Sequence, residues 1–233
     1  MTRLPLRLAG LVAALAAPAA APGVAAAQPV VVELIESQDC SSCPPANANL
    51  AAIAGRPDVI ALNFAVTYWD GPGWTDTFGT KGFTARQWDY AHAFHRTQVF
   101  TPQVVIDGRR DGVGIKPDEF TRLVGRGTAA PATPGLKLTG GAVSIGAGPK
   151  PAQGADVWLA RYDPRTVQVA IHGGENGGRT LPHKNIVREL VRIGGWNGAA
   201  ETLRLPPPRQ SGLADAVLVQ LPRGGPILAA AKG

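Results

Sequence analysis

Cysteine and charged residues are both scarce in this sequence of 233 residues. It has two cysteines, too few for a disulfide-stabilised small domain or a four-thiolate zinc site. Charged residues make up 17% of the chain, and no run of five or six like charges occurs. The formal net charge of +6 is therefore a poor argument for nucleic-acid binding.

Long apolar runs are missing as well, although apolar residues are plentiful. No stretch approaches the roughly 20 apolar residues of a membrane-spanning helix, so a stable membrane span is not predicted. Hydrophobic residues nevertheless make up 45% of the chain, which excludes disorder of the whole protein. The length allows one large domain or two small ones.

The first 27 residues have the pattern of an export signal. Arg3 and Arg7 form a basic head, an apolar run follows from Leu8 to Ala17, and no acidic residue precedes Glu33. Ala25-Ala26-Ala27 supplies the small residues at which a signal peptidase cuts. We therefore expect a periplasmic or secreted protein whose mature chain begins near Gln28.

The two cysteines lie between a predicted strand and a predicted helix. Residues 29–36 are rich in β-branched side chains, Cys40-Ser-Ser-Cys43 follows, and residues 46–55 have helical spacing. A second apolar run at 59–66 completes a strand–helix–strand unit with parallel strands. A Cys-x-x-Cys motif at this position resembles the thioredoxin type of redox site.

This position suits thiol chemistry, because a helix N-terminus stabilises a thiolate. Cys40 is the candidate attacking sulfur and Cys43 the sulfur that resolves the mixed disulfide. The alternative interpretation is a small structural disulfide in an exported protein.

The segment Thr101-Pro102-Gln103 precedes another predicted strand, which ends at Asp107-Gly108. The thioredoxin resemblance implies that Pro102 is a cis-proline packed against the cysteines and that the backbone of Thr101 binds an extended substrate. Gln103 is assigned to the same substrate-binding region. The alternative is an ordinary trans proline that opens an edge strand.

Residues 67–98 form an insertion relative to a minimal thioredoxin-like domain. Tyr68, Trp69 and Trp74 are candidates for the wall of a substrate groove beside Cys40, or they simply cover the sheet. A helix is predicted from Thr84 to His95. His92 and His95 have the spacing of one helical face, yet they are more typical of a solvated surface than of a metal site.

A buried acid is a further feature of thioredoxin-type sites, where it helps to move a proton off the second thiol. The resemblance places it six residues before the first cysteine, but Leu34 occupies that position here. Glu33 is the better candidate for proton transfer, because its neighbours in the strand are apolar. Glu36 lies two positions beyond Leu34.

Residues 126–135 form a linker rich in small residues and proline, and short predicted strands follow it. We therefore predict that residues 136–233 form a separate β-rich region, with a turn at Asp163-Pro164. The polar segment Gly173–Thr180 is either a structural turn or a loop that faces a ligand. His183 has no nucleophile partner that the sequence identifies.

The predicted fold class is an α/β thioredoxin-like domain (residues 28–125) followed by a β-rich, sandwich-like C-terminal region. Residues 31–108, with the motifs CSSCPP, YWD and TPQVVIDG, resemble an exported bacterial family of uncharacterised thioredoxin-like proteins. The C-terminal part of that family is resembled by three further segments, which are residues 175–179 (ENGGR), 185–188 (NIVR) and 224–227 (GGPI). The resemblance implies no known substrate.

These observations predict an exported thiol-disulfide oxidoreductase that acts on protein thiols or disulfides and needs no cofactor. The first alternative is a carrier of copper or another soft metal that uses both cysteines and a histidine such as His95. The second is a non-catalytic adaptor braced by a structural disulfide.

Overall fold

The structure is a computed structural model that describes residues 28–127 and 133–233. The predicted signal segment, residues 1–27, and residues 128–132 of the predicted linker lie outside the described residues. The elements of the first half are β1 (Val30–Glu36), α1 (Cys43–Ile53), β2 (Val59–Ala65), α2 (Lys81–Ala93), β3 (Gln103–Ile106), β4 (Arg110–Gly112) and α3 (Pro117–Val124). The second half consists of β5 (Leu136–Thr139), β6 (Ala142–Ile145), β7 (Ala155–Ala170), β8 (Thr180–Trp196), β9 (Glu201–Arg204), β10 (Ala214–Gln220) and β11 (Ile227–Lys232).

The strand–helix–strand unit around the cysteines is present as predicted. β1 and β2 pair in parallel over their whole length, from Val30 opposite Val59 to Glu36 opposite Ala65. Every residue of β2 is buried, as expected of an apolar strand that is covered on both faces. The cysteines therefore follow the carboxyl end of a strand in the middle of the sheet.

The predicted fold class, a thioredoxin-like α/β domain followed by a sandwich-like region, is wrong. Strands of both halves form one mixed sheet of eight strands, in the order β11-β10-β7-β8-β2-β1-β3-β4. The two halves join where Asn63 of β2 pairs with Ile186 of β8, and the side chain of Asn185 donates to the carbonyl of Ala61 (2.9 Å). An unpaired β2 edge would leave buried backbone groups without partners, and β8 supplies them.

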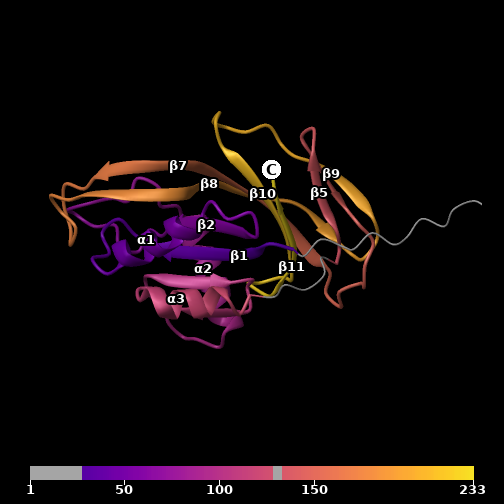
Figure 1. Ribbon diagram of the computed structural model, residues 1–233, viewed down its shortest axis with the longest axis horizontal. Coiled ribbons are helices and arrows are strands. Elements are labelled where there is room, and N and C mark those ends of the chain that lie inside the picture. Colours follow the sequence, from indigo (N-terminus) through magenta and orange to yellow (C-terminus); the bar gives the residue numbers. More distant parts are fainter. Residues whose placement is uncertain (1–27, 128–132) are drawn as a thin grey trace, which may run out of the picture.

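The hairpin of β7 and β8 is longer than the sequence suggests. Two strands were expected on either side of Asp163-Pro164, but β7 runs through this position as one strand of 16 residues. The pairing with β8 shifts register between Asp163 and Thr166, so the proline is accommodated by an irregularity and not by a chain reversal. The long hairpin extends beyond the other strands and runs alongside α1 (Figure 1).

Two apolar clusters fix the helices to opposite faces of the sheet. α1 and α3 pack through Leu50 and Phe120 against one face, where Leu34 is a central residue. α2 packs through Phe83 and Tyr90 against the other face. None of the helices in the described ranges is long and apolar enough to cross a membrane.

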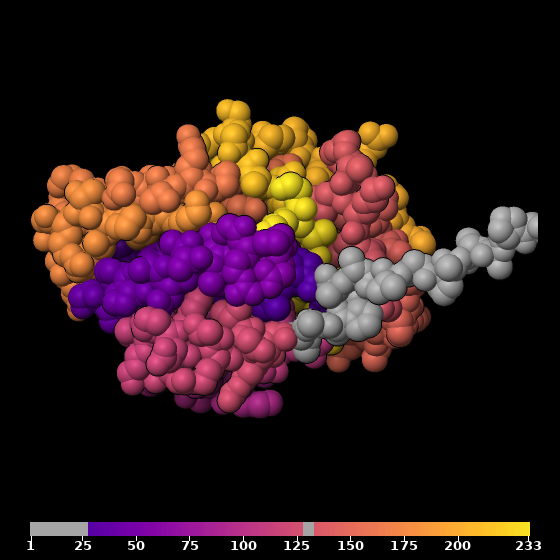
Figure 2. Space-filling model, in the orientation of Figure 1, coloured from indigo at the N-terminus to yellow at the C-terminus, as the bar shows by residue number. Residues whose placement is uncertain are grey.

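The smaller sheet, in the order β5-β6-β9, packs on a third cluster. Val143 and Val157 lie in its centre beside the buried indole of Trp196. In the space-filling view the orange β7–β8 segment lies directly against the indigo segment that carries the cysteines (Figure 2). The C-terminal half thus completes the sheet of the first half and also covers part of it.

Candidate redox site

The two cysteines form a disulfide within the turn between β1 and α1. Their Cα atoms are 5.4 Å apart, and the backbone N–H of Cys43 donates to the carbonyl of Cys40 (3.1 Å). Cys43 is the first residue of α1, followed by two prolines in the first turn, where the missing N–H groups cost nothing. Both cysteines are about 1% exposed, so the disulfide is closed to solvent.

The start of α1 differs in detail from the sequence expectation. The helical spacing in the sequence begins at residue 46, whereas α1 begins at Cys43, with Ser42 at the cap position and no capping hydrogen bond from its side chain. Its hydroxyl oxygen lies 3.3 Å from the sulfur of Cys40 instead. Asp39 and Ser41 bond to a segment far away in the chain.

That segment is the tip of the β7–β8 hairpin, residues 173–179, which covers the cysteine turn. The side-chain amide of Asn176 donates to the carbonyls of Gln38 (2.9 Å) and Cys40 (3.0 Å). The carboxylate of Glu175 accepts from the backbone N–H of Ser41 (3.1 Å). The sequence left open whether this segment is a turn or a ligand-facing loop, and the structure shows that it contacts the cysteine turn of its own chain.

Two glycines let the tip approach without intervening side chains. A Cβ at Gly173 would lie 1.9 Å from the carbonyl oxygen of Gly73, and a Cβ at Gly174 would lie 1.7 Å from the carboxylate of Asp39. Gly174 also has φ +68°, which favours glycine. The carboxylate of Asp39 accepts from the backbone N–H of Glu175 at this contact.

Tyr68, Trp69 and Thr101 meet beside the predicted cis-proline. The Thr101–Pro102 peptide bond is cis, as the thioredoxin resemblance implies. The indole N–H of Trp69 donates to the hydroxyl of Thr101 (2.8 Å). Tyr68 is 42% exposed. Partial burial raises the pKa of its phenol, and hydrogen bonds with Gln87, Thr101 and Trp69 oppose part of this rise.

The other two candidates for substrate binding have different surroundings. Trp74 donates its indole N–H to the side chain of Gln38 (3.1 Å) and lies against the ring of His172, directly before the hairpin tip. The buried amide of Gln103 accepts from Gln87 (3.0 Å) and donates to Asp111 (2.8 Å). Trp74 thus belongs to the covered side of the turn, and the amide of Gln103 is engaged within the protein.

Glu33, the candidate for proton transfer, is held in a buried ion pair. Its carboxylate accepts two hydrogen bonds from the guanidinium of Arg86 (2.9 and 2.7 Å), which also donates to Tyr90 and Gln220. Burial lowers the pKa of Arg86, but the charge and hydrogen bonds of Glu33, together with Tyr90 and Asp89, outweigh it, so this pKa is raised. These contacts connect β1, α2 and β10, and none of them involves a cysteine.

A second buried acidic group was not assigned a role by the sequence. Glu36, at the end of β1, lies 3.0 Å from Nδ1 of His183 on β8, and both side chains are almost fully buried. Within the described part of the chain, the other carboxylate oxygen of Glu36 and Nε2 of His183 have no hydrogen-bond partner. Glu36 and His183 are 147 positions apart in the sequence, so no pattern of local spacing could have identified the pair.

Asp76 completes this group and connects it to the cysteine turn. Its carboxylate accepts from the backbone N–H of Gln38 (2.7 Å), two residues before Cys40. Burial, helped by the charge of Glu36, raises the pKa of Asp76 to about 6. Burial lowers the pKa of His183, but the carboxylates of Glu36 and Asp76 outweigh it, so this pKa lies above its usual value.

His95, the histidine named for the copper-carrier alternative, lies just beyond the end of α2. His92 packs on the ring of Trp88, and His92 and His95 are both exposed. In residues 28–127 and 133–233, no group of three or more histidine, cysteine or acidic side chains is placed to hold a metal ion.

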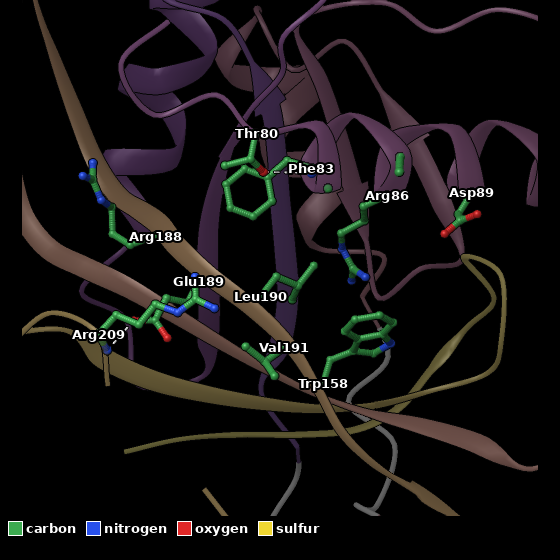
Figure 3. Close-up of a pocket in the computed structure, with 12 residues that line it drawn as sticks. Thr80, Phe83, Arg86, Asp89, Trp158, Arg188, Glu189, Leu190, Val191 and Arg209 are labelled. Atoms are coloured by element: carbon green, nitrogen blue, oxygen red, sulfur yellow. Dashed lines mark hydrogen bonds between the residues drawn. The ribbon is translucent and has the colours of Figure 1, made fainter. Parts of the chain in front are cut away.

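A cavity of about 360 Å³ lies between α2 and the middle of the β7–β8 hairpin. Figure 3 shows Arg188 and Arg209 at one end and the indole of Trp158 nearer the other. Neither cysteine lines this cavity. It is therefore separate from the candidate redox site.

Comparisons with known proteins give a family and a fold. The model of a family described as a protein of unknown function (DUF1223) matches residues 31–220. An X-ray crystal structure of a protein from Agrobacterium tumefaciens is similar, with 32% identity, a TM-score of 0.68 and coverage of 87% of this chain and 92% of that one. HBP35 of Porphyromonas gingivalis is similar in fold, with 15% identity, a TM-score of 0.55 and coverage of 88% of this chain and 74% of that one. None of the curated proteins matches this chain.

Proposed function

Because the chain belongs to the DUF1223 family of proteins of unknown function, we propose its function from the geometry of the cysteine turn. The proposed activity is thiol-disulfide exchange with protein substrates at the Cys40–Cys43 disulfide. The proposal includes export, since residues 1–27 have the pattern of a signal peptide and disulfides persist in oxidising compartments.

The position of the disulfide is the observation that carries the proposal. It joins residues three positions apart within one turn and ties no two elements of the fold together. In the chain-entropy account, closing such a four-residue loop stabilises a protein by only about 2 kcal/mol, less than a longer loop would. Exchange chemistry explains two cysteines at this spacing better than bracing does.

In the proposed reaction, a thiolate of the substrate attacks the sulfur of Cys40. A substrate–Cys40 disulfide forms, the Cys40–Cys43 bond breaks, and Cys43 leaves as a thiolate at the N-terminus of α1, where the helix stabilises negative charge. The second thiol of the substrate then attacks the mixed disulfide and releases Cys40. Two electrons and two protons pass from the substrate dithiol to the protein, and the reverse sequence reduces a substrate disulfide.

Thr101, Pro102, Tyr68 and Trp69 are the proposed contacts for the substrate chain. The exposed phenol of Tyr68 and the Trp69–Thr101 hydrogen bond support this assignment. An aromatic ring and a threonine beside a cis-proline offer an extended peptide both apolar contact and hydrogen bonds. Glu33 carries no role in this proposal, because Arg86 holds its carboxylate.

A structural disulfide is the second candidate, and the near-complete burial of both cysteines favours it. The two candidates differ in the fate of substrate dithiols. The wild-type protein is mixed with insulin and dithiothreitol, and separately with a reduced dithiol peptide, beside Cys40→Ser and Ser144→Ala, an exposed control on β6. Exchange predicts that wild type and Ser144→Ala accelerate at least one reaction and Cys40→Ser neither.

Equal rates for wild type and Cys40→Ser would overturn the proposal. The structural candidate makes its own prediction, which is a cooperative loss of stability on mild reduction without turnover of either substrate. Thermal unfolding with and without dithiothreitol measures this directly.

A further inference from the structure

The hairpin tip occupies the backbone groups that an incoming substrate chain would need. Asn176 holds the carbonyl of Cys40 with an amide N–H, and Glu175 holds the N–H of Ser41 with a carboxylate oxygen. An amide donor and an oxygen acceptor are also what the backbone of an extended polypeptide presents. The tip thus imitates a bound chain on the outer side of the cysteine turn.

We propose that residues 173–179 are an autoinhibitory lid that an extended substrate polypeptide displaces from the Cys40 turn. The lid is a property of the same site, so this inference rests on the proposed exchange activity. With the lid seated, the cysteines are about 1% exposed, and a thiolate has no access to the sulfur of Cys40. Displacement exposes this sulfur and frees the backbone groups of residues 38–41 for the substrate.

The composition of the lid makes displacement inexpensive. Its sequence is Gly-Gly-Glu-Asn-Gly-Gly-Arg, so opening exposes no large apolar side chain and forfeits mainly hydrogen bonds. Directly beside it, Ile171 and Leu181 pack with Trp74 and Phe78 in an apolar cluster. This cluster anchors the hairpin, so that the tip moves while β7 and β8 stay paired.

Two matched glycine substitutions test the lid. Gly173→Ala places a methyl group 1.9 Å from the carbonyl of Gly73, a backbone atom that cannot turn aside. Gly55→Ala is the control outside the lid, since its Cβ meets nothing within 4 Å and its φ is not positive. The control adds the same methyl group without touching the lid. Glu175→Ala is a third variant that removes the Ser41 contact from an exposed position.

The measurement is the rate at which dithiothreitol reduces the Cys40–Cys43 disulfide, followed by alkylation and mass spectrometry. We expect Gly173→Ala to be reduced about tenfold faster than wild type, the change that corresponds to one or two lost hydrogen bonds. Glu175→Ala should be reduced about two- to threefold faster, and Gly55→Ala at the wild-type rate. Equal rates for Gly173→Ala, Glu175→Ala and wild type would overturn the lid.

The two proposals fail in different ways. If the lid exists but the protein does not exchange with protein substrates, Gly173→Ala speeds reduction by dithiothreitol while every variant stays inactive towards insulin and dithiol peptides. If exchange occurs without a lid, wild type and Gly173→Ala are equally active in all assays. Circular dichroism of each variant confirms that the comparison is made between folded proteins.

Discussion

The base of the β7–β8 hairpin, around Arg161, and its tip, residues 173–179, differ in composition and in the contacts that hold them. At the base, the buried guanidinium of Arg161 donates to Asp215 (3.0 Å), to Glu189 (3.2 Å) and to the carbonyls of Pro206 and Pro207. At the tip, residues 173–179 contain no large apolar side chain and hold the cysteine turn by a few polar contacts.

This difference shows how one hairpin can both stabilise the fold and control access to the disulfide. A buried charge with several partners is costly to disturb, because each partner is left unpaired in turn. A glycine-rich tip without an apolar face can open while the rest of the hairpin stays in place. Substitutions at the base should therefore change the free energy of unfolding, and substitutions at the tip the reactivity of the disulfide.

The largest effect is expected at the base. Arg161→Met leaves the buried carboxylate of Glu189 and the carboxylate of Asp215 without their guanidinium, which should lower the free energy of unfolding by about 3–5 kcal/mol. Urea denaturation with the disulfide intact measures this loss. The rate of reduction by dithiothreitol, taken under conditions where the variant is folded, should stay at the wild-type value.

Arg56→Met is the control for that prediction. Arg56 pairs with Asp58 (2.6 Å), and the two side chains are 49% and 61% exposed, so removing the pair should change stability little. An Arg161→Met protein as stable as Arg56→Met would contradict the assignment of the base. Faster reduction of the disulfide in Arg161→Met would show that base and tip are not independent.

A smaller and pH-dependent effect is expected from the Glu36–His183–Asp76 group between the two ends. Asp76 has a pKa of about 6 in the folded protein, against 3.8 as its ordinary value. A group whose pKa is raised by folding stabilises the protein below its unfolded pKa, and this contribution is lost as the pH rises through the folded pKa. The shift corresponds to about 3 kcal/mol lost between pH 4 and pH 7.

Asp76→Asn removes this titration, so the variant should lose less stability than wild type over the same pH interval. His183 contributes with the same sign, because its pKa is also raised. Chemical denaturation at pH 4, 5, 6 and 7 gives the two curves, with Asp118→Asn as an exposed control on α3. Parallel curves for wild type and Asp76→Asn would show that the buried position of Asp76 does not control its ionisation.

The smallest effect on stability is expected at the tip. Asn176→Ala removes two hydrogen bonds and leaves the carbonyls of Gln38 and Cys40 without that donor, at a cost of about 1–2 kcal/mol. Unlike Arg161→Met, the variant should combine this modest cost with faster reduction of the disulfide. A large loss of stability at an unchanged rate would mean that the tip is part of the structural core.

The sequence predicted the local site better than the architecture. Cys40 follows β1 and Cys43 begins α1, as the local pattern predicts, and the cis bond before Pro102 that the resemblance implies is present. The pairing of β8 with β2 was not predictable, because Asn63 and Ile186 are far apart in the chain. The local sequence of a strand does not determine which other strand it pairs with. The interpretation of Asp163-Pro164 as a turn was wrong for a related reason, as the long β8 partner keeps β7 in one strand.

The buried carboxylates show the same limit. Glu33 and Glu36 lie on one strand, and alternation in a strand directs them to opposite faces. Their different surroundings arise from Arg86 on α2 and from His183 on β8, which local sequence cannot assign. The hairpin tip was recognised as unusually polar, but its contact with the cysteine turn depends on the long-range pairing of the hairpin.

The most direct test of the central claim is the formation of a mixed disulfide on Cys40. Cys43→Ala and Cys40→Ala proteins are each incubated with oxidised insulin, quenched with acid, and analysed by mass spectrometry under non-reducing conditions. The account predicts a stable insulin adduct on Cys40 of Cys43→Ala, formed faster when Gly173→Ala is added, and little adduct on Cys43 of Cys40→Ala. No adduct on Cys40 in either protein that carries Cys43→Ala would contradict it.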